Sequence, residues 1–397
     1  MRVTVIDNFG TIPDGRKWGG RYLYVAEKMA EKGHDVTYIQ TDFDHLSKKH
    51  FTKITGAYKS KVVLLHVPGY GDNISYKRLW SHYLWGCKVY NYLKQNEKPD
   101  VIFIHIPSMT AAVKAASYCK KNGVRYIIDV MDIWPEVFYM SVKNKLVRFL
   151  MKPLEWYINK AYSAADEIVA VSQTYADRAL SVNKKVKKGL SVFIGNDGEN
   201  FDKSRDKNMV HYNDGCLRIA YIGTIGYSYD IPCFLRALKL YKDNNCKPEM
   251  KFVVMGDGPK LNEFRQMSKE LGVDAEFTGR IDYEDMVGRL CSCDMLANCI
   301  VKGAQQSITN KVGDYALSGL PVINTQENLE YRSYVENLQL GINCRCGNER
   351  DVFEAMKKLA SNPDLRKKYG DNQRKFGVKY FDIRYSYQPI FDLIEGK

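Results

Sequence analysis

The amino-acid sequence predicts an α/β protein with two doubly wound, Rossmann-like domains that face each other across a central cleft. Short apolar runs alternate with amphipathic stretches of helical length, which is the pattern of βαβ units and parallel sheets. The same alternation begins again near the middle of the chain, and 397 residues are too many for one ordinary domain. We therefore expect one domain over residues 1–198, a second over 199–380, and a C-terminal helix over 381–397 that returns to the first.

In the first half, a helix is expected over Tyr22–Glu31, where Gly33 provides the C-terminal cap. A second helix is expected over Pro107–Lys121, and it ends in the same way at Gly123. Six apolar runs predict the strands, at Val3–Ile6, Val36–Ile39, Val62–His66, Val101–Ile106, Tyr126–Val130 and Glu167–Val171.

The second half begins after Asn196–Asp214, a segment rich in Gly, Asn, Asp and Lys that we expect to form the boundary between the domains. A turn at Gly256–Pro259 leads into a helix, and a charged helical region, Val352–Ile394, closes the chain. Strands are predicted at Leu217–Ile222, Phe252–Met255, Asp294–Ala297, Pro321–Asn324 and Leu340–Asn343.

The formal net charge of +13 favours a polyanion, an anionic membrane surface or a phosphorylated substrate, although solvated surface lysines would give the same total. The first residues become charged too soon for a signal peptide, and no run reaches about 18 apolar residues. A cytoplasmic protein whose ten cysteines are free thiols is therefore expected. Two C-x-C pairs, at residues 291–293 and 344–346, lack the usual zinc spacing, so no metal site is expected.

Gly19 and Gly20 follow the first strand and open the first helix. Glycines let backbone amides approach a phosphate, and the N-terminus of a helix favours an anion. The spacing is not that of a dinucleotide fingerprint, and an ordinary glycine loop is the alternative.

Polar residues follow two neighbouring strands of the first domain. His105 lies at the carboxyl end of its strand, where ligands bind in parallel sheets, and could transfer a proton or contact phosphate; a structural histidine is the alternative. Asp129, Asp132 and Trp134 end the next strand, where the carboxylates could bind acceptor hydroxyl groups or cap a helix.

The polar loop at residues 305–310 leads into a helix that ends at Gly319, and a strand follows. The helix N-terminus offers unpaired N–H groups, and Lys311 is placed to neutralise a diphosphate. Asp314 lies one turn beyond Asn310, and its carboxylate would suit the two hydroxyl groups of a ribose. Alternatively, the polar residues of this loop only cap the N-terminus of the helix.

Two basic stretches rich in aromatic residues, at 76–85 and 143–160, suit an anionic lipid surface. Each could equally be a helix that faces the core and carries solvated lysines.

Taken in order, these motifs resemble those of the retaining glycosyltransferases of family four, which have the GT-B fold, and of their bacterial surface-polysaccharide branch. The resemblance covers nearly the whole chain. It rests on Gly19-Gly20 with Gly33-His34-Asp35-Val36, His105-Ile106-Pro107, Asp132–Pro135, Tyr221-Ile222-Gly223, Gly256–Pro259, Phe277–Arg280 and Ser318–Ile323.

The resemblance implies a donor site in the second domain and an acceptor site in the first, with catalytic roles for His105 and Lys311. It implies acceptor contacts from Asp129, Asp132 and Trp134. The donor-binding residues that it implies are Gly19, Gly20, Gly223, Arg280, Gln306, Ser307, Ile308, Asn310 and Asp314.

Two positions depart from the family pattern. Gln306 stands where the first acid of the Glu-x₇-Glu signature is found, and Asp314 stands at the second. The residues after Gly223 include neither the Arg nor the Lys that many members use to hold the diphosphate. Lys311 is then the expected phosphate cation, helped by Arg280 or Arg21.

We therefore expect a metal-independent hexosyltransferase without a cofactor, which transfers a sugar from a UDP-linked donor to a glycan or polyprenyl-linked acceptor in surface-polysaccharide synthesis. Peripheral contact with the inner face of the membrane is expected through the first domain. A non-catalytic partner subunit with this fold and a nucleotide-sugar epimerase are the alternatives. A nucleic-acid partner is not expected, because the basic residues form no recognisable reading motif.

Overall fold

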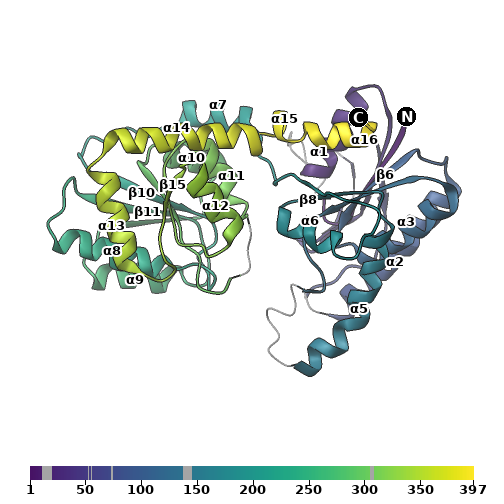
Figure 1. Ribbon diagram of the computed structural model, residues 1–397, viewed down its shortest axis with the longest axis horizontal. Helices are drawn as coiled ribbons and strands as arrows, with labels where there is room; N and C mark the ends of the chain where they lie inside the picture. The colour runs from purple at the N-terminus through teal and green to yellow at the C-terminus, as the bar shows by residue number, and fades with distance from the viewer. Residues whose placement is uncertain (11–19, 52, 55, 73–74, 137–144, 305–307) are drawn as a thin grey trace. The chain divides into compact units, whose positions relative to one another are not determined.

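The computed structural model describes residues 1–10, 20–51, 53–54, 56–72, 75–136, 145–304 and 308–397. Its contacts divide the chain into two compact units, one formed by Met1–Phe193 with Tyr387–Lys397 and the other by Ile194–Ser386. Each unit contains a parallel sheet flanked by helices, which confirms the predicted fold class (Figure 1).

The sheet of the first unit is parallel throughout, in the order β5-β2-β1-β6-β7-β8-β9. The six predicted strands are confirmed, and the short β9 and the β3–β4 hairpin were not predicted. The strands are β1 (Arg2–Asp7), β2 (Asp35–Thr41), β3 (Phe43–Asp44), β4 (Lys49–His50), β5 (Lys61–Leu65), β6 (Val101–Ile106), β7 (Arg125–Val130), β8 (Glu167–Ala170) and β9 (Leu190–Ser191).

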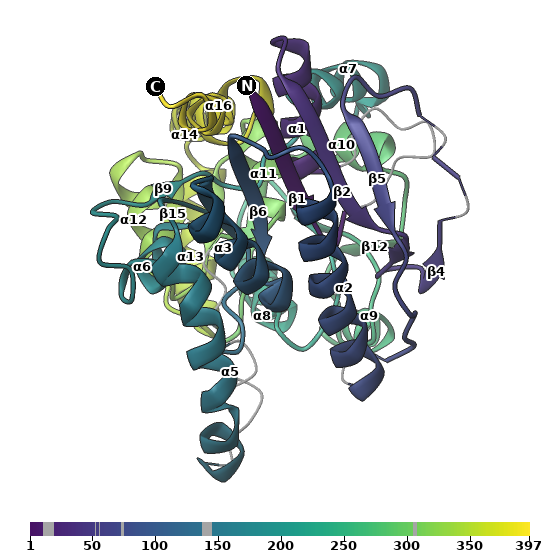
Figure 2. The same cartoon turned by 90° about the vertical axis from the view of Figure 1, so that its right-hand side faces the viewer.

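Helices α2 (Tyr76–Gln95), α3 (Met109–Asn122) and α5 (Lys145–Ala164) pack side by side in front of this sheet (Figure 2). Trp85 of α2 and Tyr162 of α5 are fully buried in the core that these helices share with the sheet. The unit also contains α1 (Arg21–Glu31), α6 (Gln173–Leu180) and α16 (Gln388–Glu395).

The C-terminal helix α16 is held on the first unit by polar contacts at its end. Arg125 donates hydrogen bonds to the carbonyl oxygens of Leu393 (2.8 Å) and Ile394 (3.0 Å). Glu395 lies 3.2 Å from both Lys32 Nζ and His34 Nε2. The first unit is therefore completed by residues from the far end of the chain.

The second unit has a parallel sheet in the order β12-β11-β10-β13-β14-β15. Its strands are β10 (Leu217–Ile222), β11 (Met250–Met255), β12 (Ala275–Gly279), β13 (Met295–Asn298), β14 (Val322–Asn324) and β15 (Gly341–Asn343). Its helices are α7 (Gly198–Asn208), α8 (Ile231–Asp243), α9 (Leu261–Glu270), α10 (Tyr283–Cys291), α11 (Lys311–Ser318), α12 (Leu329–Asn337), α13 (Glu349–Ala360), α14 (Pro363–Tyr380) and α15 (Ile383–Ser386).

The boundary segment expected at Asn196–Asp214 is not a loop, because most of it forms α7. Asp197 caps this helix by accepting a hydrogen bond from the backbone N–H of Asn200 at 3.0 Å. Phe201 is fully buried against Val287 and Leu317. The polar composition of the segment concealed this one buried face, and the chain passes between the units just before the helix, after Phe193.

Three neighbouring strands of the second unit end in asparagines whose side chains form a ladder. Asn298, Asn324 and Asn343 occupy paired positions on β13, β14 and β15. Asn298 donates to Asn324 and Asn324 donates to Asn343, each at 2.8 Å. The ladder pairs buried amide groups at the sheet edge, although Asn298 Oδ1 has no partner among the described residues.

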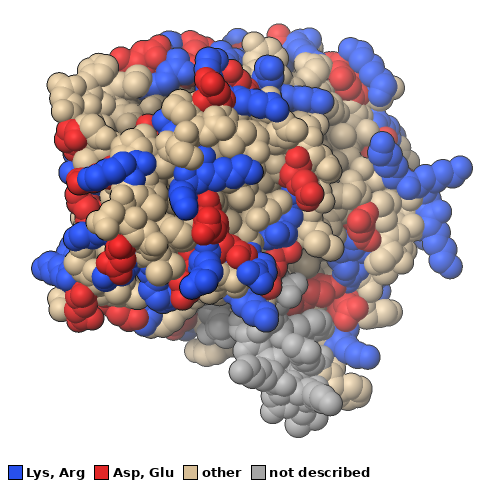
Figure 3. Space-filling view, turned by 60° about the vertical axis from the view of Figure 1, so that its left-hand side comes forward, with Lys and Arg blue, Asp and Glu red and all other residues tan. Residues whose placement is uncertain are grey.

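Charged side chains of both signs are mixed on the face of the protein that Figure 3 shows. Lysines and arginines there lie beside acidic residues. On that face, the excess basic charge is distributed over the surface.

Candidate functional site

Two glycine turns lie close together at the carboxyl edge of the second sheet, after β10 and β11. A Cβ atom on Gly256 would lie 1.9 Å from the carbonyl oxygen of Gly223, and one on Gly258 would lie 2.3 Å from that of Ile225. The turns are joined by hydrogen bonds from Ile225 N–H to Asp257 O (2.9 Å) and from Lys260 N–H to Ile225 O (3.0 Å). Only glycine at positions 256 and 258 permits this close approach of the two backbones.

Lys311, the first residue of α11, lies buried beside the Gly223 turn. Its Nζ atom lies 4.0 Å from the ring centre of Tyr221 and 3.8 Å from that of Tyr229. A Cβ atom on Gly223 would lie 3.5 Å from the same nitrogen. Burial lowers the pKa of Lys311 to about 7. Within the described residues, this buried amine has no hydrogen-bond partner.

The hydroxyl group of Thr309 is also buried without a partner among the described residues, two positions before Lys311. The N-cap of α11, Asn310, makes no side-chain capping bond. The N-terminus of a helix carries a partial positive charge, so it adds to the field of the amine. Together these groups form a site suited to an anion, and a phosphate group would satisfy donors that are otherwise unpaired.

Asp314 lies one turn further along α11, and its Oδ1 accepts hydrogen bonds from Asn196 Nδ2 (2.7 Å) and Tyr283 Oη (2.8 Å). Burial raises the pKa of this carboxyl group to about 6. Asp314 therefore ties α11 to α10 and to the segment before α7. Its contact with a ribose stays a prediction.

The other expected donor residues lie at several places. Gly223 forms the turn above Lys311, and Gly20 precedes α1 in the left-handed region with a φ of 85°. Arg280 is exposed just after β12, Asn310 is exposed at the start of α11, and Ile308 is half-buried. Gly19, Gln306 and Ser307 lie outside the described residues.

In the first unit, His105 of β6 forms a dyad with Asp7, the last residue of the adjacent strand β1. His105 Nδ1 and Asp7 Oδ1 are 2.7 Å apart, and both side chains are buried. The imidazole ring stacks on Tyr22 with ring centres 4.6 Å apart. The carboxylate fixes the orientation of the ring, which is how a histidine that transfers protons is positioned.

Asp129 is fully buried and forms an ion pair with Arg21, whose Nε lies 2.9 Å from Asp129 Oδ2. Arg21 also donates a hydrogen bond to the carbonyl oxygen of Val192 at 2.8 Å. Both side chains are buried, so in this arrangement neither is exposed to a substrate. Arg21 and Asp129, which were expected to contact substrate, instead join α1 to β7 and to the end of β9.

Asp132 accepts hydrogen bonds from the indole N–H of Trp134 and from the backbone N–H of Ile133, both at 3.0 Å. Burial raises the pKa of its carboxyl group. The guanidinium of Arg78 lies 4.7 Å from the centre of the Trp134 ring. Asp132 therefore holds the indole in place beneath a cation from α2, rather than capping a helix.

Phe9 lies among three histidines at this edge of the sheet. Its ring centre lies 5.3 Å from that of His45, 5.6 Å from that of His82 and 5.7 Å from that of His105. Burial lowers the pKa of His45 to about 4 and that of His82 to about 3, so both rings are neutral near pH 7. Aromatic faces, neutral imidazoles and Arg78 are a combination that suits a sugar.

Sequence reasoning missed Asp7, Phe9, His45 and His82 as members of this first-unit cluster. Asp7 ends a strand adjacent to that of His105, so the order of the strands would have indicated the dyad. Arg78 and His82 belong to the stretch that was singled out as basic and aromatic, and they lie on the inward face of α2.

Comparisons with known proteins match each unit separately. Residues 21–188 match the family model described as Glycosyltransferase Family 4, and residues 217–362 match that described as Glycosyl transferases group 1. An uncharacterized glycosyltransferase of Methanocaldococcus jannaschii is 23% identical over 266 residues, 63% of each chain.

A second relative, from Campylobacter jejuni, is an α-1,4-N-acetyl-D-galactosaminyltransferase whose name describes a GalNAc-containing glycan on diNAcBac-PP-undecaprenol. It is 27% identical over 189 residues, which are 47% of this chain and 46% of the relative. The matched regions thus span less than two thirds of both curated relatives.

Solved structures share the fold over the whole chain. Alr3699/HepE of Anabaena, in complex with UDP, has a TM-score of 0.68 at 15% identity, and each chain is covered completely. WaaG, a glycosyltransferase involved in lipopolysaccharide biosynthesis, has a TM-score of 0.62 at 16% identity, again with complete coverage.

Replacing Asp129 by Asn should destabilise the protein strongly, because Arg21 would remain buried without a counter-charge. Removing one partner of a buried pair costs about 3–5 kcal/mol, so the free energy of unfolding should fall by that amount in urea denaturation. Asp35→Asn is the control, since Asp35 and its partner Arg2 are both exposed and 3.7 Å apart. Equal losses in the two variants would contradict the assignment.

Proposed function

We propose that the chain is a glycosyltransferase that transfers a sugar from a UDP-sugar to a glycan or lipid-linked glycan, with retention of configuration; the two matched family models and the shared fold of the solved glycosyltransferase structures support this. The observation that carries the proposal is Lys311, a buried amine without a described partner at the start of α11. The Gly223 turn, whose Cβ position would lie 3.5 Å from the Lys311 amine, brings a backbone that could approach a diphosphate beside it.

The donor diphosphate would be held by Lys311, by the Thr309 hydroxyl group and by backbone N–H groups at the start of α11. These donors favour the anion most when negative charge accumulates on it, as it does when the sugar leaves. Structures of Alr3699/HepE with UDP and with UDP-glucose support a nucleotide sugar as the donor. We propose that transfer needs no metal ion, because these groups supply the positive charge.

In the reaction that we propose, an acceptor hydroxyl oxygen forms the new bond to the anomeric carbon of the sugar while the bond to the diphosphate breaks. The hydroxyl proton passes to the departing diphosphate oxygen on the same face. This route needs no protein nucleophile. The role of the protein is then to position the donor and to stabilise the leaving group.

The acceptor would bind at the carboxyl edge of the first sheet. Phe9 and the partly buried imidazoles of His45 and His82 would offer flat surfaces to a sugar ring, and the His105–Asp7 dyad would offer a polar contact. Trp134 is itself buried and stacks on His82. The Campylobacter jejuni relative, named for a glycan on undecaprenyl diphosphate, supports a lipid-linked acceptor from surface-polysaccharide synthesis.

Peripheral membrane contact would come from the outward faces of α2 and α5. Basic residues accompany their apolar side chains, which suits anionic lipid. Within the described part of the chain, no helix is long and apolar enough to cross a bilayer. The exposed apolar residues are Tyr76, Leu79, Trp80 and Tyr83 on α2, and Phe149, Leu154 and Trp156 on α5.

Incubating the full chain with UDP-sugars and polyprenyl diphosphate-linked glycans should release UDP and give a longer glycan. Lys311→Met should abolish most of this turnover, whereas Lys302→Met, at an exposed lysine ahead of the same helix, should not. Product analysis by NMR should show an anomeric configuration equal to that of the donor. UDP binding without turnover would indicate a non-catalytic partner, and isomerised donor without acceptor would indicate an epimerase.

UDP binding should weaken as the pH rises above 7. The pKa of Lys311 in the unliganded protein is lowered to about 7, and a diphosphate beside it would raise this pKa. Between these two values binding takes up a proton, so the affinity should fall by up to about tenfold per pH unit. Above pH 7 Asp314, with a pKa of about 6, is already ionised and does not contribute.

Calorimetry in buffers of different ionisation enthalpy would measure this proton uptake. Lys311→Met should remove the pH dependence and weaken binding at pH 7 by at least about tenfold, as expected for loss of a charge-assisted hydrogen bond. An affinity in the wild-type protein that does not change between pH 7 and 9 would exclude the proposed contact.

Vesicles of phosphatidylglycerol should bind the protein more strongly than vesicles of phosphatidylcholine, and added salt should weaken the binding. Leu79→Ser together with Trp80→Ser should reduce sedimentation with the anionic vesicles. Leu329→Ser removes an exposed leucine of the second unit and should have no effect. If the wild-type protein, the double variant and Leu329→Ser sediment equally, α2 does not contact the membrane.

A further inference from the structure

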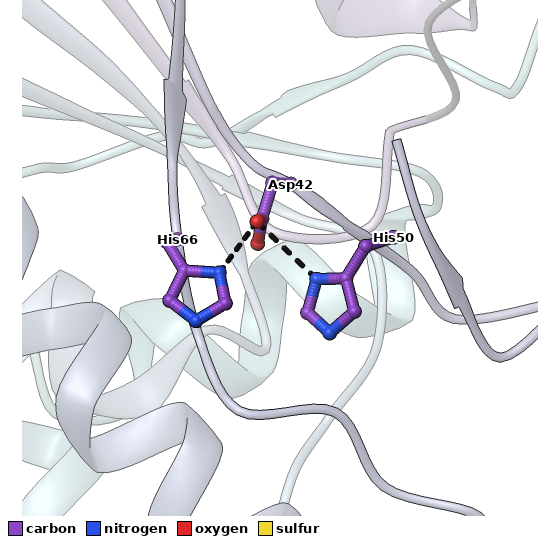
Figure 4. Close-up of side chains that lie close together, drawn as sticks. All are labelled: Asp42, His50 and His66. Atoms are coloured by element: carbon purple, nitrogen blue, oxygen red, sulfur yellow. Dashed lines mark hydrogen bonds and ion pairs between the residues drawn. The ribbon is translucent and has the colours of Figure 1, made fainter. Parts of the chain in front are cut away.

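Apart from the proposed donor and acceptor sites, Asp42, His50 and His66 of the first unit bring their side chains together (Figure 4). Asp42 follows β2, His50 belongs to β4 and His66 follows β5. The three residues therefore come from three separate segments, and the fold is what joins them.

The ligand atoms of the three side chains all lie within 4.8 Å of one another. Asp42 Oδ2 is 2.7 Å from His66 Nδ1 and 3.2 Å from His50 Nδ1, and Figure 4 shows both imidazoles turned toward this one oxygen. Ligand atoms about 2.0–2.1 Å from a tetrahedral zinc ion are roughly 3.3–3.4 Å apart. To reach that spacing, His66 Nδ1 would move roughly 0.6 Å away from Asp42 Oδ2, while His50 Nδ1 already lies within about 0.2 Å of that spacing.

The carboxylate of Asp42 is fixed by the backbone around it. Its Oδ1 accepts a hydrogen bond from Val67 N–H at 3.1 Å. The backbone of Asp42 pairs with Leu65 O (3.1 Å) and with Phe51 N–H (2.6 Å). Outer hydrogen bonds of this kind orient the ligands of protein metal sites. One carboxylate oxygen is thereby left directed toward the histidines.

The imidazole of His50 is also restrained. Its ring lies 5.2 Å from that of Phe43, and a Cβ atom on Gly69 would lie 3.2 Å from its Nε2. Nδ1 is therefore the nitrogen that faces Asp42. His66 is largely exposed, with 69% of its side chain accessible, so the cluster is open to an ion from solvent.

We propose that Asp42, His50 and His66 bind a divalent transition-metal ion of the zinc class, with water in the remaining position. Two imidazole nitrogens and one carboxylate oxygen suit zinc, cobalt or nickel, whereas magnesium and calcium prefer oxygen ligands alone. The ion would join the β3–β4 hairpin to the end of β5. It takes no part in the sugar transfer proposed above, so nucleotide binding should not depend on it.

Calorimetric titration of the chelator-treated full chain with Zn²⁺, in a non-coordinating reductant, tests this site. One tight site is expected, and its affinity should fall by at least about tenfold in His66→Gln, as for loss of a metal contact. The double variant His50→Gln/His66→Gln should lose the site. Zn²⁺ should raise the Tm of the wild-type protein and leave that of the double variant unchanged.

His211→Gln is the matched control, because His211 is exposed in the second unit and lies outside the cluster. Far-ultraviolet circular dichroism and the metal-free Tm, measured on every variant, show that it has folded. Unchanged Zn²⁺ affinity in the double variant would overturn the proposal. So would a Co²⁺ complex with thiolate charge-transfer absorption that survives in that variant, since it would assign the metal to cysteines.

Discussion

Parallel strand pairing is the constraint on which the two candidate sites depend, because it brings the carboxyl ends of neighbouring strands to one edge of each sheet. In the first unit, this register places Asp7, His105 and Asp129 on three adjacent strands. In the second unit, it places the turns after β10 and β11 side by side. The polar groups at each edge are therefore neighbours in space although the chain between them is long. The central strands, such as β6 and β10, are buried along their whole length.

The two units treat buried charge in opposite ways. Arg21 and Asp129 neutralise each other inside the first unit, so that pair fixes the position of α1 on the sheet. Lys311 of the second unit is buried over two tyrosine rings, and no carboxylate balances it among the described residues. A buried amine in that state loses its proton readily. Burying this amine costs free energy, and only a bound anion would offset that cost. Lys311 therefore contributes to ligand binding rather than to the stability of the fold.

Much of the fold could be predicted from the sequence, because strands buried on both faces are read as continuous apolar runs. Helix α7 could not, since a surface helix of polar residues resembles a loop in composition. The place of Lys311 at the start of a helix could be predicted, but its position beside Gly223 and the burial of Arg21 and Asp129 could not. A side chain at the edge of a sheet turns inward or outward according to its neighbours across the strands. The Asp42, His50 and His66 cluster was also missed, because its members meet only once the β3–β4 hairpin has formed.

The return of α16 to the first unit has a consequence for how the protein is made. The residues that Arg125, Lys32 and His34 hold follow the whole of the second unit along the chain, so they are translated after it. The N-terminal half can form its sheet during synthesis, yet its outer layer stays incomplete until the second unit has also been translated. A gene fragment that encodes only the first 193 residues would lack this helix, whereas one that encodes residues 194–386 would contain its whole unit. The first unit can therefore be completed only after the second unit has been translated.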